Sequence, residues 1–474
     1  MKANNRAALE DLASIQGLNM IQEPSELQHL ARDRTGAGED WPLALVEPTS
    51  TEEVQQIVRI CREHSVALVP QGGRTGYAGG ACSMGNDVLI SLGRMNRILA
   101  LDPYLPALQV EAGCITRTVQ TYALDHGYYF PVDFASAGSS QIGGNAATNA
   151  GGIRLIRYGG MRNHVLGLKA VTGAGEILET NGHILKDNTG YDFRDLIVGS
   201  EGTLAIITEL TLGLTAAPPE SLVLLCALPG LSAILDLLGH CRILGTDLHA
   251  FEFFDNNCLQ SVMHYNDLEN PFPQLAASKA GPAWFCLLEC TAGDRATESL
   301  LESEELHRLC LEVLPAESES GKRKFWSYRE NISESLSHGP VHKNDISIPL
   351  ASIPEYVETL TSMLRRDYAD MKSYLFGHIG DGNIHINLKP GATERQEAHK
   401  ASAESFALQC QKFDRDNIEH ILRFQGSISA EHGIGLLKRD SLMKVRDERY
   451  IRWMKEIKKT FDPDGILNPG KIFS

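Results

Sequence analysis

Three stretches of small residues, separated by β-rich segments, constrain the fold of this chain more than any other feature. They are residues 71–80 (QGGRTGYAGG), residues 131–152 (PVDFASAGSSQIGGNAATNAGG) and residues 199–203 (GSEGT). Few of these residues could form a core of large side chains, whereas small residues let the backbone approach a flat ligand closely. The pattern predicts one extended ligand threaded across a domain, and a dinucleotide fits that description.

The first stretch follows residues 66–70 (VALVP), which predict a buried strand. A glycine-rich turn after a strand is typical of a Rossmann dinucleotide site. Here the glycine spacing is not GxGxxG, and residues 87–92 (DVLISL) predict a second strand rather than a helix. We therefore expect loop amides between two strands to hold phosphates, as a backbone nest does. The alternative for this loop alone is an ordinary glycine-rich hairpin.

Residues 377–387 (GHIGDGNIHIN) combine turn chemistry with a polar strand face. Residues 380–382 predict a turn, because glycine accepts the positive φ of a tight turn and Asp can bond its own backbone. After the turn, polar residues alternate with isoleucines. In an extended strand this alternation places Asn383, His385 and Asn387 on one face.

His378 precedes that turn, so its imidazole and that of His385 can converge on one point. Downstream, residues 429–435 (SAEHGIG) offer the Glu431 carboxylate and the His432 imidazole. Two histidines and one carboxylate are typical ligands of a catalytic metal, usually Zn²⁺, with one position left open for substrate. We therefore predict a metal site on His378, His385 and Glu431. The alternative is that the histidines only satisfy hydrogen bonds in a sheet.

The composition argues against several classes of partner. The 474-residue chain carries a net charge of −16, which disfavours nucleic acid or an anionic membrane. Its ten cysteines include no CxxC pair, which favours reduced thiols in a cytosolic core over an iron–sulfur cluster.

The first residues (MKANNRAALEDLASIQ) lack the apolar core of a signal peptide. The most apolar window, residues 222–241, contains Pro229, Gly230 and Asp236, and therefore predicts a strand, a turn and a helix rather than a transmembrane segment. We predict a cytoplasmic protein.

A break in the pattern at residues 216–220 (AAPPE) marks the best domain boundary. Before it, residues 1–40 predict a polar, helical lead-in. Ser50 and Glu53 form a capping box that begins an amphipathic helix, which we expect to end near His64.

After this boundary, strands such as residues 283–290 (AWFCLLEC) alternate with amphipathic helices at residues 353–367 and about residues 394–424. This alternation is α+β patterning. The tail, residues 461–471 (FDPDGILNPGK), is rich in turn residues, and we expect it to dock back on the body of the protein.

Six motifs in a fixed order carry a resemblance to a known family. They are PQGGRTGYAGGA, IGGNAATNAGG, GSEGTLAIITE, HIGDGNIH, AEHGIG and LNPGKI, and they cover the chain from about residue 40 to Ile472. In this order they resemble the FAD-dependent 2-hydroxy-acid dehydrogenases of the vanillyl-alcohol-oxidase-like superfamily. Each motif alone is weak, whereas six in sequence are highly specific. Residues 151–159 and 326–350 are most similar to the D-2-hydroxyglutarate dehydrogenase branch.

The resemblance implies an α+β fold with a two-part PCMH-type FAD-binding domain and an α+β substrate cap built on an antiparallel sheet. The FAD domain would span residues 1–220, with its core at about residues 38–217. The cap with the metal site would span residues 221–455, and residues 456–474 would return to the FAD domain. Relatives that bind flavin covalently usually carry His at the position of Arg74, so the resemblance implies non-covalent FAD.

The resemblance also assigns FAD-binding residues by motif position. They are Pro70, Gln71, Gly72, Gly73, Arg74, Thr75, Gly76, Tyr77, Ser136, Ala137, Ser140, Gly143, Gly144, Asn145, Thr148, Asn149, Gly151, Gly152, Glu201, Gly202, Ile206, Ile207 and Asn468.

For the substrate, the resemblance places Arg329, Ser333 and Lys343 against a distal carboxylate. Relatives carry Thr at the position of Ser333, and the segment is one residue shorter before Lys343. Asn387 would hydrogen-bond the bound acid, with Asn383 as a second candidate. Judged without the resemblance, Arg329 and Lys343 are solvated charges on a helix face.

The implied reaction is oxidation of a D-2-hydroxy acid, D-2-hydroxyglutarate before D-lactate or glycolate. The metal, Zn²⁺ or Mn²⁺, would chelate the acid, His432 would take the hydroxyl proton as general base, and the C2 hydride would pass to flavin N5. By resemblance only, the electron acceptor is an electron-transfer flavoprotein or a quinone, and the assembly a homodimer. Two rival hypotheses are a non-redox flavin-dependent transferase, such as the alkyl-dihydroxyacetone-phosphate synthases, and a non-catalytic flavin-binding subunit.

Overall fold

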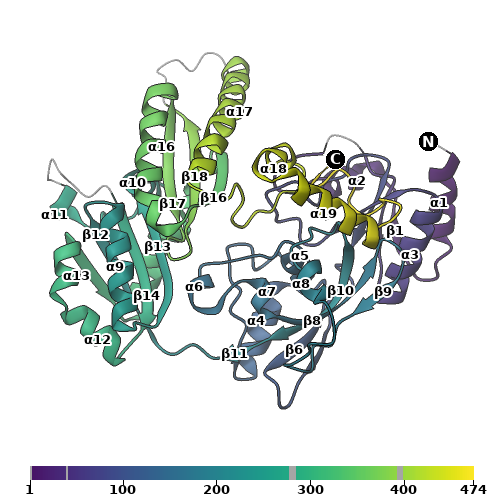
Figure 1. Cartoon of the computed structure of the whole chain (residues 1–474), viewed down its shortest axis with the longest axis horizontal. Helices are drawn as coiled ribbons and strands as arrows, with labels where there is room; N and C mark the ends of the chain where they lie inside the picture. Colours follow the sequence, from purple (N-terminus) through teal and green to yellow (C-terminus); the bar gives the residue numbers. More distant parts are fainter. Residues whose placement is uncertain (1–2, 39–40, 277–283, 392–398, 474) are drawn as a thin grey trace. The chain divides into compact units, whose positions relative to one another are not determined.

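The computed structural model describes residues 3–38, 41–276, 284–391 and 399–473 (Figure 1). The chain forms two compact units. The first comprises Met1–Gly152, Tyr158–Pro218 and Glu431–Ser474, and the second comprises Ile153–Arg157 and Pro219–Ala430. The division after Pro218 falls inside the segment that the sequence marks as a boundary.

The return of the chain to the first unit begins earlier than the sequence predicts. Residues 431–455, which we assigned to the cap, belong to the first unit. The Glu201 carboxylate accepts hydrogen bonds from the N–H groups of Ile434 (2.8 Å) and Gly435 (2.7 Å), and thereby fixes this segment. These contacts join residues that are far apart in the chain, so no local sequence pattern predicts them.

The first unit contains a four-stranded sheet in the order β1-β2-β4-β3. Its strands are β1 (Asn19–Ile21), β2 (Ala44–Glu47), β3 (Ala67–Gln71) and β4 (Asp87–Ser91). β4 pairs in parallel with both β2 and β3. A hairpin would pair β3 and β4 antiparallel, so the glycine-rich loop between them is a crossover and the hairpin alternative is wrong.

α3 (Thr51–Glu63) joins β2 to β3 and starts where the capping box predicts. The Ser50 side chain accepts a hydrogen bond from the Glu53 N–H at 3.1 Å. The helix buries Val54, Ile57, Val58 and Cys61 against the sheet core, as its amphipathic pattern predicts.

A second, antiparallel sheet in the same unit has the order β5-β6-β10-β8-β9. Its strands are β5 (Ile98–Leu101), β6 (Ala107–Glu111), β8 (Val165–Thr172), β9 (Ile177–Glu179) and β10 (Ala205–Gly213). One apolar cluster joins both sheets. The short helices around this sheet are α4 (Thr116–Asp125), α5 (Ile142–Ala147), α6 (Leu155–Tyr158), α7 (Met161–His164) and α8 (Phe193–Ile197).

α5 lies inside the second small-residue stretch, which we expected to be a loop throughout. The helix packs closely on the end of β6, because a Cβ at Gly143 would lie 2.6 Å from the Cβ of Ala112. Small residues here therefore serve backbone packing as well as access for a ligand.

The lead-in and the tail both belong to the first unit. α1 (Ala3–Ala13) and α2 (Pro24–Leu30) flank the unpredicted strand β1, while α18 (Arg439–Val445) and α19 (Glu448–Phe461) precede the tail. Leu467 forms a parallel bridge with Leu68 of β3, and the Lys471 ammonium donates to the Cys82 carbonyl at 2.9 Å. Figure 1 shows the yellow C-terminal helices with the purple N-terminal elements of this unit. The docking of the tail is confirmed.

The second unit is built on a seven-stranded antiparallel sheet in the order β15-β12-β14-β13-β17-β18-β16. Its strands are β12 (Ser221–Leu228), β13 (Leu248–Asp255), β14 (Trp284–Thr291), β15 (Glu312–Ala316), β16 (His342–Ser347), β17 (Met371–Gly377) and β18 (Asn383–Pro390). The antiparallel cap sheet is confirmed. β14 agrees with the strand predicted at residues 283–290, except that residue 283 lies outside the described residues.

Helices cover both faces of this sheet. One cluster packs side chains of α10 (Asn256–Asn266), α14 (Glu319–Glu330) and α15 (Ile332–Ser335) on the strands. α9 (Leu231–Leu244) follows β12 after a turn, as predicted, and α16 (Ile353–Asp367) has its predicted bounds. α17 (His399–Arg423) agrees with the predicted long helix where the structure describes it, and residues 394–398 lie outside that part. The remaining helices are α11 (Pro273–Ala276), α12 (Arg295–Glu302) and α13 (Glu304–Leu309).

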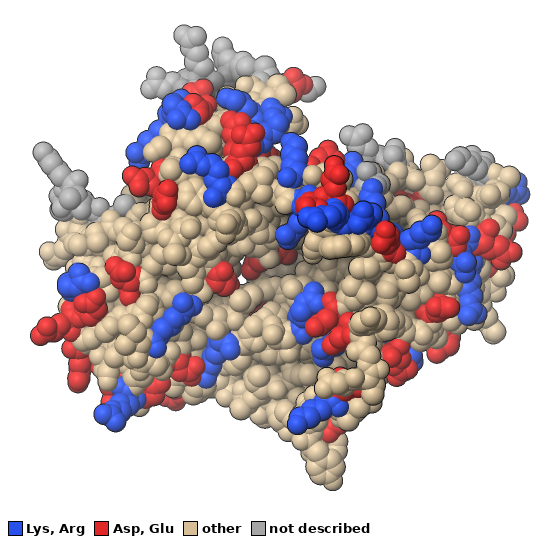
Figure 2. All heavy atoms as spheres, viewed as in Figure 1, with Lys and Arg blue, Asp and Glu red and all other residues tan. Residues whose placement is uncertain are grey.

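Charged side chains of both signs are spread over the visible surface. Figure 2 shows Lys and Arg mixed with Asp and Glu over the visible face, without one large basic surface. No helix in the described ranges combines the length and the apolarity needed to cross a bilayer. All ten cysteines are buried free thiols.

Candidate active site

A pocket in the first unit lies where the three small-residue stretches meet. Its lining consists of Pro70, Gln71, Gly72, Gly73, Arg74, Thr75, Gly76, Ala78, Gly80, Ala81, Leu92, Ala112, Gln141, Gly143, Gly144, Asn145, Ala147, Thr148, Glu201, Gly202, Ala205, Ile206, Ile207 and His432. All three stretches contribute, as expected for one ligand threaded across the domain.

Glycines of two stretches pack backbone against backbone beside this pocket. A Cβ at Gly73 would lie 2.0 Å from the Ser139 carbonyl oxygen, and one at Gly72 would lie 3.4 Å from the Gly144 Cα. At Gly76, by contrast, a Cβ would meet nothing within 4 Å. The loop after β3 is therefore held by its first two glycines and leaves open space further along.

Most residues assigned to FAD by resemblance line the pocket. They are Pro70, Gln71, Gly72, Gly73, Arg74, Thr75, Gly76, Gly143, Gly144, Asn145, Thr148, Glu201, Gly202, Ile206 and Ile207. The others lie outside its lining: Tyr77, Ser136, Ala137, Ser140, Asn149, Gly151, Gly152 and Asn468.

Several of these outer residues hold the pocket walls. The Asn468 amide donates to the carbonyls of Gly80 and Glu201, at 2.9 Å each, and so ties two pocket loops together. The Ser140 hydroxyl lies 2.8 Å from that of Thr116, which also accepts a hydrogen bond from the amide of Asn145.

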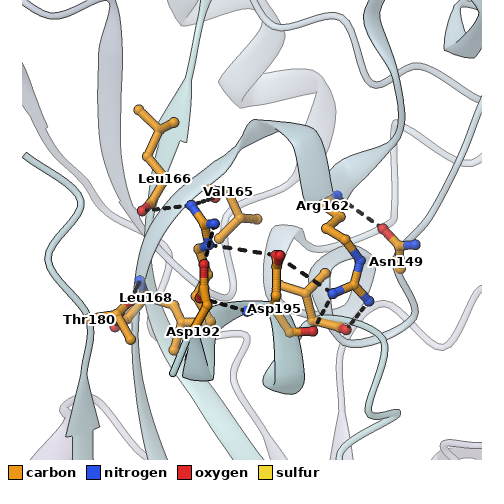
Figure 3. Close-up of polar contacts among 10 residues, drawn as sticks. Asn149, Arg162, Val165, Leu166, Leu168, Thr180, Asp192 and Asp195 are labelled. Atoms are coloured by element: carbon orange, nitrogen blue, oxygen red, sulfur yellow. Dashed lines mark hydrogen bonds and ion pairs between the residues drawn. The ribbon is translucent and has the colours of Figure 1, made fainter. Parts of the chain in front are cut away.

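Asn149 belongs to a polar network shown in Figure 3. Its side-chain oxygen accepts from the Arg162 backbone N–H at 3.0 Å. The Arg162 guanidinium donates to the backbone carbonyls of Asp195 and Val198. The residue thus anchors the end of the second stretch to α7 and α8.

Gln141 is a pocket residue that the sequence reasoning missed. It lines the pocket, and its buried side-chain oxygen is without a partner among the described residues. An unsatisfied buried acceptor is costly, and the N–H of a flavin would satisfy it. Its position directly before the IGGN run was the only local signal. This acceptor and the open space at Gly76 fit a bound FAD.

The predicted metal ligands come together. One ligand atom from each of His378, His385 and Glu431 lies within 4.8 Å of the other two. His378 follows β17 directly and His385 lies on β18, so the turn between the strands brings the two imidazoles together. Ser427 pairs with Ser347 at the end of β16, four residues before Glu431. Two imidazoles and a carboxylate are a donor set that fits Zn²⁺ or Mn²⁺.

The polar strand face also forms as predicted. In the register of β16 and β18, Lys343 lies opposite Asn387 and Asp345 lies opposite His385. Residues that oppose each other in a ladder share a face. The Asn387 amide nitrogen is buried and has no partner in the described part of the chain. Asn383 instead donates to Asp345 (2.7 Å) and to the Ile346 carbonyl (2.9 Å).

Arg329 is neither a solvated charge nor an uncompensated one. It is 6% exposed, and its guanidinium lies 2.7 Å from the Glu252 carboxylate and 5.0 Å from the centroid of the Phe376 ring. The helix-face alternative is therefore wrong for Arg329. It is also wrong for Lys343, which lies half-buried on strand β16. Ser333, the third residue assigned to the distal carboxylate, is exposed on α15.

His432 lines the pocket of the first unit, with its ring centroid 5.1 Å from that of Tyr77. Gly433 follows with φ of +78°, a conformation that favours glycine. The Glu201 carboxylate then holds the next two N–H groups. Burial raises the pKa of Glu201, although these two donors and Lys438 oppose the shift.

Comparisons with known proteins agree with this geometry. Residues 42–181 match the model of the FAD binding domain, and residues 217–472 match that of the FAD linked oxidases, C-terminal domain. The fold and site thus define a FAD-dependent dehydrogenase. The chain belongs to the FAD-linked oxidase family.

Two of the similar curated proteins are D-2-hydroxyglutarate dehydrogenases. A D-2-hydroxyglutarate dehydrogenase of Stutzerimonas stutzeri (strain A1501) is 40% identical over 98% of this chain and 100% of its own length. The mitochondrial D-2-hydroxyglutarate dehydrogenase of Danio rerio is 34% identical over 98% of this chain and 86% of its own length.

Solved structures share the fold. A substrate-bound p-cresol methylhydroxylase has a TM-score of 0.77 at 15% identity, covering 100% of this chain and 97% of its own. An alkyldihydroxyacetonephosphate synthase has a TM-score of 0.73 at 17% identity, covering 98% of this chain and 84% of its own. At such identities the likeness extends to fold alone.

Proposed function

We propose that the protein oxidises D-2-hydroxyglutarate to 2-oxoglutarate, with non-covalent FAD and a divalent metal, Zn²⁺ or Mn²⁺. The observation that carries this proposal is the cluster of His378, His385 and Glu431, within 4.8 Å of one another. The substrate assignment is supported by the name of the relative that is 40% identical along its whole length.

When bound, FAD supplies a hydride acceptor and the metal a Lewis acid for the acid's carboxylate and hydroxyl oxygens. His378, His385 and Glu431 would hold the metal. His432, the next residue in the chain, takes the hydroxyl proton on an imidazole nitrogen as the C2 hydride leaves. The substrate loses one proton and one hydride, and its alcohol carbon becomes a ketone.

Residues of the polar strand face orient the acid. The buried amide nitrogen of Asn387 has no partner among the described residues, and it donates to a substrate oxygen, which satisfies a group that is otherwise costly to bury. Lys343, opposite Asn387, offers its ammonium to the distal carboxylate. Arg74 occupies the position at which covalent relatives carry His, and a guanidinium forms no such bond to the flavin.

The electrons leave through a separate acceptor, which we propose to be an electron-transfer flavoprotein or a quinone. A cytoplasmic location is supported by the composition and by the ten buried free thiols.

The same chemistry on a monocarboxylic acid is the second candidate. The ion pair of Arg329 with Glu252 favours this second candidate. Glu252 neutralises the charge of Arg329, which is one of the two cations assigned to the distal carboxylate. Steady-state kcat/KM with an artificial acceptor, measured on D-2-hydroxyglutarate, D-lactate, glycolate and D-malate, decides between them. We expect D-2-hydroxyglutarate to exceed D-lactate and glycolate by at least tenfold, about 1.4 kcal/mol. Equal or higher values for a monocarboxylic acid would overturn the substrate assignment.

A further inference from the structure

We propose that Glu252 is a positioning residue for the metal ligand His378, and that Asp345 does the same for His385. Neither carboxylate is among the predicted ligands. The proposal rests on the metal site of the proposed function and adds residues that set its affinity.

Glu252 lies on β13 and is 1% exposed. One of its carboxylate oxygens lies 2.8 Å from His378 Nδ1, and the other lies 2.7 Å from the Arg329 guanidinium. A buried carboxylate is costly unless it is paired and hydrogen-bonded. Glu252 satisfies both conditions, and its two partners lie on different elements.

The contact with Glu252 fixes the tautomer of His378. An imidazole that donates its Nδ1 proton to a carboxylate keeps the lone pair on Nε2. That nitrogen is then the one left to bind a metal, and the ring can no longer turn freely. Metal-bound histidines commonly have a carboxylate partner of this kind, which also raises the basicity of the ligand.

Asp345 repeats the arrangement on β16, the strand that pairs with β18. It is 0% exposed on β16, lies opposite His385 in the ladder, and its Oδ1 is 3.5 Å from His385 Nδ1. The same oxygen accepts from the Asn383 amide at 2.7 Å, which holds the carboxylate in place. Because 3.5 Å exceeds an ordinary hydrogen bond, we expect Asp345 to contribute less than Glu252.

Arg329 then acts on the metal site through Glu252. Its charge compensates the buried carboxylate, and its guanidinium stacks on Phe376, the residue paired with His385 between β17 and β18. A substitution of Arg329 therefore changes metal affinity as well as any contact with substrate.

The test measures metal affinity rather than turnover. Full-length protein is stripped with a chelator and titrated with Zn²⁺ against a chromophoric competitor. We expect Glu252→Gln to weaken Zn²⁺ binding by about 10- to 100-fold and Asp345→Asn by less. The matched control is Glu289→Gln, which removes a buried carboxylate on β14 that pairs with Arg154 at 2.9 Å instead of with a predicted ligand.

The double variant Glu252→Gln/Arg329→Met guards against misfolding, because it removes both charges of the pair. It should fold and show the same weakened binding. Unchanged affinity in Glu252→Gln, or an equal loss in Glu289→Gln, would overturn the positioning role. A wild-type protein that binds no Zn²⁺ or Mn²⁺ would overturn the metal site itself, and the positioning role with it.

Discussion

At the scale of single residues, the partner of a polar group decides what that group can do. Asn387 has a buried amide nitrogen with no partner among the described residues, and it is therefore ready to receive a ligand. Arg329 is also buried, but its charge is paired with Glu252. The sequence motifs assign both to substrate, and only the fold separates their roles.

His432 is the residue on which proton removal depends. We expect His432→Ala to slow flavin reduction by substrate by at least about 100-fold, the range of general-base contributions. Stopped-flow reduction under anaerobic conditions measures this rate, with FAD content determined for each preparation. His64→Ala is the control, because His64 pairs with Asp11 on the surface of the first unit. A His432→Ala variant that reduces its flavin at the wild-type rate contradicts the assignment.

At the scale of elements, the loop between parallel strands β3 and β4 shapes the FAD pocket. Gly73→Ala places a Cβ 2.0 Å from the Ser139 carbonyl oxygen, and we expect a lower FAD-to-protein ratio and a Tm reduced by several degrees. Gly138→Ala is the matched control, since a Cβ there meets nothing within 4 Å. Absorbance ratios and thermal unfolding of both variants provide the comparison. If both behave as wild type, close backbone packing does not hold the loop.

Elements with a local cause could be predicted from the sequence. Ser50 caps the start of α3, as the capping-box pattern predicts, although the Glu53 carboxylate accepts from the Thr49 N–H rather than from that of Ser50. The apolar period of residues 353–367 gives α16. The strand β1 and the short helix α5 were not predicted. β1 is three residues long and forms by pairing with β2, while α5 forms by packing on β6.

The candidate site was predictable only to the extent that its residues are near in sequence or belong to a motif. His378 and His385 flank one turn, and Glu431 lies in the AEHGIG motif. Glu252 was missed because it precedes His378 by 126 positions and meets it only through the β13–β17 junction. The early return at Glu431 was missed for the same reason, because its anchor is Glu201.

At the scale of the whole molecule, a buried carboxylate makes the second unit sensitive to acid. Burial alone would raise the pKa of Glu289, but His249 and Arg154 outweigh it and lower this pKa from 4.5 to about 2. A depressed pKa stabilises the fold above the unfolded value, and this stability is lost as pH falls from about 4.5 towards 2.

We therefore expect the urea midpoint of the wild type to fall between pH 5 and pH 3. Glu289→Gln should lack the part of this fall that comes from protonation of Glu289. The difference in urea midpoint between the two proteins should therefore shrink as the pH is lowered. Equal midpoints at pH 7 that stay equal at pH 3 contradict the assigned ion pair.

We propose that this FAD-dependent dehydrogenase uses a metal held by His378, His385 and Glu431 to oxidise D-2-hydroxyglutarate. The most direct test is anaerobic bleaching of the flavin absorbance by D-2-hydroxyglutarate in three samples: chelator-stripped protein, the same protein reloaded with Zn²⁺, and protein reloaded with Mn²⁺. We predict slow or no bleaching without metal and rapid bleaching after at least one metal is restored. Full-rate bleaching in protein shown to be metal-free, or no bleaching in any sample, would contradict this role of the metal.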